Sequence, residues 1–152
     1  MNITDKPSKT IPGKAELVIP GRIWWAGAIG VAAAVVCNLI VRAVLFALLP
    51  LPEQFLPLQP TAIATFTVIG TALAAVVFAL VVRFSVTPIR TFRVIAIVAL
   101  VVSILPNLGL MANPSAAPFP GGSALAFGVL CIFHGIAALV CAAVLTTLTQ
   151  KH

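Results

Sequence analysis

Charged side chains are scarce in this chain of 152 residues, of which 8% are charged, three are acidic and 61% are hydrophobic. A soluble domain of this length cannot bury so much apolar surface in its core. We therefore expect an all-α membrane protein. The formal net charge of +6 does not indicate a partner among nucleic acids, because the basic residues flank apolar segments and form no nucleic-acid reader motif.

The few cysteines and histidines lack the spacing that redox and metal sites need. Cys37, Cys131 and Cys141 lie inside apolar runs and form no CxxC pair, which argues against a disulfide framework, a zinc site and a thiol redox centre. His134 is the only intramembrane histidine, since His152 is terminal, and only a homodimer pairing two copies of it would keep haem possible. We expect no catalytic residue, no metal and no cofactor, and hence not an enzyme.

Four apolar runs are long enough to cross a bilayer, which takes about 20 helical residues. They cover approximately residues 23–49, 61–82, 94–112 and 123–148. The connecting segments LPLPEQFLPLQ, RFSVTPIRTFR and NPSAAPFPGGS contain the proline, glycine and serine that stop helices. The pattern predicts one four-transmembrane-helix bundle over residues 23–149, preceded by a polar tail over residues 1–22.

The basic residues predict the orientation of the bundle. They lie before the first span, between the second and third spans, and after the fourth: Lys6, Lys9, Lys14 and Arg22; Arg83, Arg90 and Arg93; Lys151. Because Lys and Arg concentrate in cytoplasmic loops, both termini are predicted to be cytoplasmic.

The only charge inside an apolar run belongs to Arg42, and Asn38 lies one helical turn before it. Such groups are costly in hydrocarbon and usually face a bundle interior or an aqueous cavity. Glu53 in the first outer loop is a possible ion-pair partner for Arg42; Asn107, backbone carbonyls, lipid phosphate or a ligand are the alternatives. A third interpretation is that Arg42 extends outward along its stem and only pins the helix.

Small residues form stripes along the spans, and such stripes usually mark the faces where membrane helices pack. They include Gly27 and Ala34 in the first span, Gly70 and Ala74 in the second, Ala96 and Ala99 in the third, and Gly128, Gly135 and Ala138 in the fourth. Polar and small residues share faces in three spans, which predicts a packed bundle.

Several polar residues are predicted to lie at similar depth. At about 1.5 Å per residue, they fall roughly 10 to 15 Å below the outer surface. We therefore predict one ligand or partner pocket, open to the outside, formed by Asn38, Arg42, Thr67, Thr71, Ser103, Asn107 and His134. For His134 the alternative is a neutral imidazole that bonds to a neighbouring carbonyl or threonine.

The chain resembles a family of small four-span bacterial integral membrane proteins described as a domain of unknown function. The resemblance covers residues 23–148 and rests on CNLIVR, FTVIGT, TPIRTFRVIAIVAL, SILPNL and the single histidine of the fourth span. It implies a bacterial cell (inner) membrane and no established activity.

Two functional hypotheses follow from these features. The first is a non-enzymatic accessory or structural subunit, or a self-associating bundle, whose partners are membrane lipids and other membrane subunits or itself. The alternative is a binder or transporter of a small amphipathic or anionic molecule, such as a lipid, quinone or organic acid. Proton-coupled export through a membrane-embedded carboxylate is not expected, because no span contains Asp or Glu.

Overall fold

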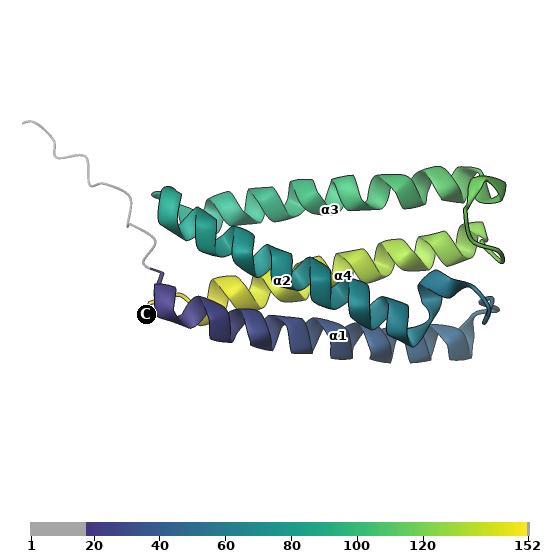
Figure 1. Cartoon of the computed structure of the whole chain (residues 1–152), viewed down its shortest axis with the longest axis horizontal. Helices are drawn as coiled ribbons and strands as arrows, with labels where there is room; N and C mark the ends of the chain where they lie inside the picture. The colour runs from purple at the N-terminus through teal and green to yellow at the C-terminus, as the bar shows by residue number, and fades with distance from the viewer. Residues whose placement is uncertain (1–17, 152) are drawn as a thin grey trace, which may run out of the picture.

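A computed structural model describes residues 18–151, which form four long helices (Figure 1). These are α1 (Ile23–Leu48), α2 (Pro60–Phe84), α3 (Pro88–Ala112) and α4 (Ala124–Leu148), with short 3-10 helices η1 (Pro20–Arg22), η2 (Leu56–Leu58) and η3 (Pro114–Ala116). All four long helices are long and apolar enough to cross a membrane. The predicted four-helix all-α architecture is thus confirmed, while most of the predicted tail lies outside the described residues.

Both ends of the described chain meet at one end of the bundle (Figure 1). Val18 and Gln150 form an isolated antiparallel bridge, and the Ile19 N–H donates to the Thr149 carbonyl at 2.9 Å. The tight α2–α3 turn lies at the same end, and the two longer connections lie at the other. We call the first the basic end, because its helix ends and turn carry Arg22, Arg83, Arg90, Arg93 and Lys151.

The third helix begins earlier than its apolar run predicts. It starts at Pro88, before the apolar run of approximately residues 94–112. Proline is favoured in the first helical turn, where its missing N–H needs no partner, and the Thr91 N–H donates to the Thr87 carbonyl at 3.0 Å. The helix therefore begins before the apolar run, and only residues 85–87 form the turn between α2 and α3.

Two clusters of buried apolar side chains hold the helices together, one near each end of the bundle. Near the basic end, the rings of Phe78 and Phe92 lie 4.8 Å apart and join α2 to α3. Near the opposite end, Phe55 packs edge-on against Phe127 of α4 at 5.3 Å. Gly27 brings α1 close to α2, since a Cβ there would lie 3.0 Å from the Ala75 Cβ.

Helix α3 packs less fully than the others. Its buried residues are Pro88, Ile89 and Phe92, all near the basic end. Beyond the contact between Phe78 and Phe92, α2 and α3 diverge toward the opposite end (Figure 1). This divergence leaves room between the two helices, and the candidate site lies there.

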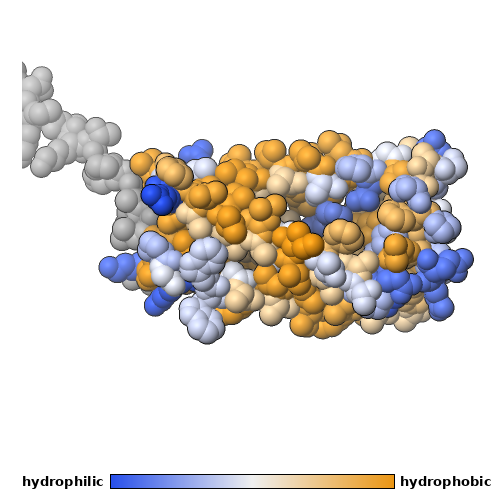
Figure 2. Space-filling view, in the orientation of Figure 1, coloured by the Kyte–Doolittle hydropathy of each residue, from blue (hydrophilic) through white to orange (hydrophobic). Residues whose placement is uncertain are grey.

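The face of the molecule shown in Figure 2 is largely apolar along the middle of the helices and more polar toward both ends. Large side chains such as Leu73 and Ile97 are 62% and 63% exposed. Continuous apolar surface of this extent is not tolerated in water, so the surface is suited to lipid.

Candidate functional site

A cavity of about 590 Å³ lies between α2, α3 and α4, and Asn38 of α1 forms part of its wall. We call it the α2–α3 cavity. Its lining is mainly apolar, and its polar or sulfur-containing side chains are those of Asn38, Thr67, Thr71, Ser103, His134 and Cys141. Five of the seven pocket residues predicted from the sequence therefore line one cavity.

The α2–α3 cavity opens sideways, between two helices that face the membrane. Phe66, Ile69 and Leu73 of α2 line it and are also 72%, 58% and 62% exposed on the outer surface. Figure 2 shows a hollow on this face, between the band of side chains from α3 and the band from α2. In a bilayer this opening meets the lipid chains, so a molecule dissolved in the membrane can reach it directly.

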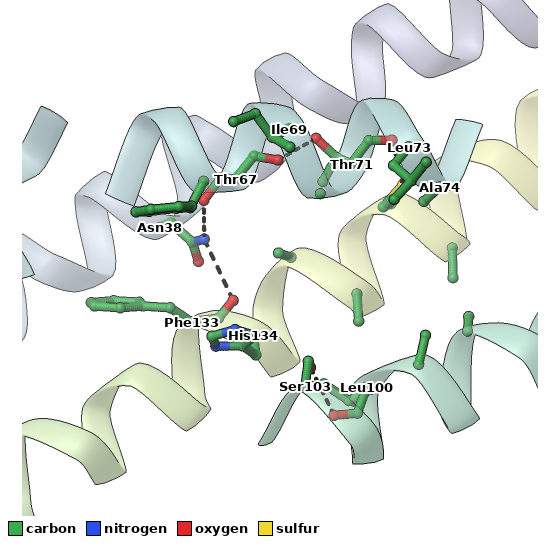
Figure 3. Close-up of a pocket in the computed structure, with 18 of the residues that line it drawn as sticks. Asn38, Thr67, Ile69, Thr71, Leu73, Ala74, Leu100, Ser103, Phe133 and His134 are labelled. Carbon is green, nitrogen blue, oxygen red and sulfur yellow. Dashed lines mark hydrogen bonds between the residues drawn. The ribbon is translucent and has the colours of Figure 1, made fainter. Parts of the chain in front are cut away.

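Asn38 connects three helices and leaves one polar atom without a partner. Its Nδ2 donates to Thr67 Oγ1 at 2.9 Å and to the Phe133 carbonyl at 3.4 Å (Figure 3). Because a backbone carbonyl can only accept a hydrogen bond, the amide atom of Asn38 that faces the Phe133 carbonyl is the nitrogen and the other is the oxygen. The residue is 1% exposed, and its Oδ1 has no hydrogen-bond partner among the described residues. An unpaired buried acceptor costs about 1–3 kcal/mol, which a suitable ligand would recover.

His134 lies on α4, next to Phe133 and across from Ser103 (Figure 3). Its Nδ1 donates to the Leu130 carbonyl of its own helix at 2.7 Å. In the neutral ring the other nitrogen, Nε2, is then an acceptor. This contact is the bond to a neighbouring carbonyl that the alternative interpretation of His134 expects, and the same residue also lines the cavity.

The remaining polar side chains of the cavity bond to helix carbonyls. Thr71 Oγ1 donates to the Thr67 carbonyl at 2.6 Å, and Ser103 Oγ donates to the Leu100 carbonyl at 2.8 Å. Cys141 Sγ donates to the Thr71 carbonyl at 3.8 Å. Such bonds to the preceding turn leave the oxygen lone pairs of Thr71 and Ser103 available to accept.

Arg42 does not line the α2–α3 cavity. Its Nε donates to the Leu58 carbonyl at 2.7 Å, and its guanidinium lies 4.1 Å from the Phe46 ring centroid. Glu53 is exposed in the same connection, and Arg42 bonds to a backbone carbonyl instead of the Glu53 carboxylate. Arg42 therefore fastens η2 to α1.

Asn107 lines a second cavity of about 530 Å³ nearer the opposite end. This cavity shares Pro57, Phe66 and Leu130 with the first. The two cavities are therefore neighbours, but Asn107 is not among the residues around Asn38. The predicted single pocket needs correction at Arg42 and Asn107.

Several small residues that were expected to mark helix-packing faces line the cavity instead. Gly70, Ala96 and Ala99 are among its lining residues, and a Cβ at Gly70 would meet nothing within 4 Å. Sequence reasoning also missed the aromatic walls formed by Phe92 and Phe133.

Four apolar helices around an intramembrane cavity define a small multi-pass membrane protein. The chain belongs to the family described as "Family of unknown function (DUF6069)", whose profile matches residues 18–119. The match includes Asn38, Thr67 and Ser103 and stops before α4, which carries His134. Searches among curated proteins and among solved structures found no match.

Proposed function

We propose that this chain is a non-enzymatic binding protein for an uncharged lipophilic small molecule that reaches the α2–α3 cavity from the lipid phase. The observation that carries the proposal is the unpartnered Oδ1 of Asn38, which is 1% exposed in the cavity wall. Buried polar groups in folded proteins are almost always bonded, and each exception calls for an explanation. A ligand that donates to this oxygen supplies one.

The size and lining of the cavity support this role. Pockets for small molecules are typically about 300–1,000 Å³, largely apolar, with a few placed polar groups. The α2–α3 cavity has about 590 Å³ and combines alanine and phenylalanine walls with the polar groups around Asn38 and His134. Its opening between α2 and α3 suits a molecule that partitions into the bilayer.

The charge of the lining narrows the ligand class. Among the described residues that line the cavity there is no Asp, Glu, Lys or Arg, and Arg42 is bonded to Leu58 outside it. A buried anion without a cationic partner would be strongly disfavoured. Of the molecules considered from the sequence, the geometry therefore favours uncharged lipophilic ones over organic acids. It also favours binding over the accessory-subunit role, for which the fold offers no comparable built site among the described residues.

We place the protein in a bacterial inner membrane with the basic end in the cytoplasm, because Lys and Arg concentrate on the cytoplasmic side. The first and last described residues lie at that end. The second cavity, with Asn107, then faces the outer leaflet and adjoins the α2–α3 cavity.

Native mass spectrometry of the protein, released gently from its own membrane, tests the proposal. The wild type should carry a stoichiometric small molecule. Ala96→Trp, which fills the cavity from α3, should lose it. Ile97→Trp is the matched control, because Ile97 is the next residue, is 63% exposed and does not line the cavity. Absence of a bound molecule from the wild type, or equal retention by both variants, would overturn the proposal.

A further inference from the structure

We infer that the ligand of the α2–α3 cavity is a hydrogen-bond donor, specifically an uncharged lipophilic phenol or hydroquinone. The inference rests on the proposed binding function and concerns the chemistry of the ligand's head group. It follows from the direction of the hydrogen bonds that the cavity side chains already make.

The donors of the cavity are already used within the protein. Both contacts of the Asn38 Nδ2 group go to protein acceptors, Thr67 Oγ1 and the Phe133 carbonyl. The Thr71 and Ser103 hydroxyls donate to carbonyls of their own helices. His134 Nδ1 likewise donates to the Leu130 carbonyl of its own helix.

The cavity also contains a thiol, which donates from Cys141 to the Thr71 carbonyl. Only the Thr67 hydroxyl hydrogen has no acceptor in these contacts. The site is therefore poor in donors.

Acceptors, in contrast, remain available. Asn38 Oδ1 is unpartnered but has almost no accessible surface, so a ligand reaches it only when the surrounding cavity wall moves aside. With Nδ1 protonated, His134 Nε2 presents a lone pair, and the Thr71 and Ser103 oxygens each keep lone pairs after donating. In Figure 3 these groups come from α1, α2, α3 and α4 and surround one space. A ligand that itself brought only acceptors, such as a quinone, ester or ether, would leave Asn38 Oδ1 unpaired.

An uncharged donor fits better than a cationic one. An ammonium group also donates, but the described lining offers no carboxylate to balance its charge in the membrane. A hydroxyl donates without that cost. The walls include the rings of Phe92 and Phe133, and aromatic rings pack favourably against one another, which favours an aromatic hydroxyl over an aliphatic one.

A competition experiment with matched probes tests the inference. The full chain in lipid nanodiscs is offered equal amounts of decylhydroquinone and its dimethyl ether under anaerobic conditions, and bound molecules are quantified by mass spectrometry. The two probes share ring and tail and differ in their two donors. Because pairing a buried orphan acceptor is worth roughly tenfold or more in a binding constant, the hydroquinone should be bound at least about tenfold in preference.

Two variants distinguish hydrogen bonding from general effects on the fold. Asn38→Leu and His134→Phe each remove an acceptor, and each should reduce the preference for the hydroquinone by about tenfold while binding of the ether persists. A variant that only damaged the fold would lose both probes equally.

The outcomes separate the inference from the proposed function. Equal binding of the two probes by the wild type, abolished for both by Ala96→Trp, would overturn the donor inference and leave cavity binding in place. Binding of neither probe, or binding that Ala96→Trp does not reduce, would overturn the inference and count against the proposed function as well.

Discussion

Replacing Asn38 with leucine should reduce the preference for a hydroquinone by about tenfold without lowering the stability of the bundle. Asn38 makes two hydrogen bonds, to Thr67 and Phe133, and leaves its Oδ1 unpaired. Intramembrane side-chain hydrogen bonds average about 0.6 kcal/mol, so the substitution forfeits roughly 1.2 kcal/mol. Removing the unpaired buried oxygen recovers about 1–3 kcal/mol. The adjoining cavity accommodates the slightly larger leucine, so the net change should lie between about zero and 2 kcal/mol of stabilisation.

The assay is reversible unfolding in mixed micelles with increasing SDS, followed by far-ultraviolet circular dichroism. Asn38→Asp is the matched control, because it keeps the shape and replaces the donating nitrogen with an oxygen that faces the Phe133 carbonyl. It should destabilise the protein by at least about 2.5 kcal/mol, the insertion cost of a central Asp. A loss of more than about 2 kcal/mol in Asn38→Leu would refute the reasoning and identify the amide as a purely structural link.

Three further predictions concern the rest of the fold. Arg42→Ala should increase hydrogen exchange in residues 55–59 by roughly tenfold, because the bond that fastens η2 to α1 is lost; unchanged protection would exclude that role. Gly27→Val should destabilise the bundle by about 1–3 kcal/mol, since a Cβ there already lies 3.0 Å from Ala75. Gly135→Val, where a Cβ meets nothing within 4 Å, should cost far less in the same SDS titration, and equal losses would contradict the close approach of α1 and α2. Reporter fusions should place Lys151 in the cytoplasm and residues 113–122 outside; the opposite result would invert the proposed orientation.

The four spans were predictable because helix length and apolarity are local properties of the sequence. The start of α3 was not predictable in this way, because the helix begins at Pro88, before its apolar run. Composition marks where a helix enters the hydrocarbon, whereas capping and proline chemistry decide where it begins.

Five cavity residues were predictable from depth alone, because a helix rises by a constant amount per residue. The partner of Arg42 was not, because the position of the Leu58 carbonyl depends on how the 49–59 connection folds over α1. Small residues likewise predict close packing only if nothing separates the helices. Here α2 and α3 diverge beyond the contact between Phe78 and Phe92, and Gly70 faces open space.

An experimental density map of the protein in nanodiscs of its own membrane lipids tests the central claim most directly. The account predicts an elongated density that enters between α2 and α3 and ends within hydrogen-bond distance of Asn38 Oδ1 and close to His134. A map in which α3 closes against α2 and fills the space beside Asn38, or in which lipid chains occupy the opening without reaching that oxygen, would contradict it.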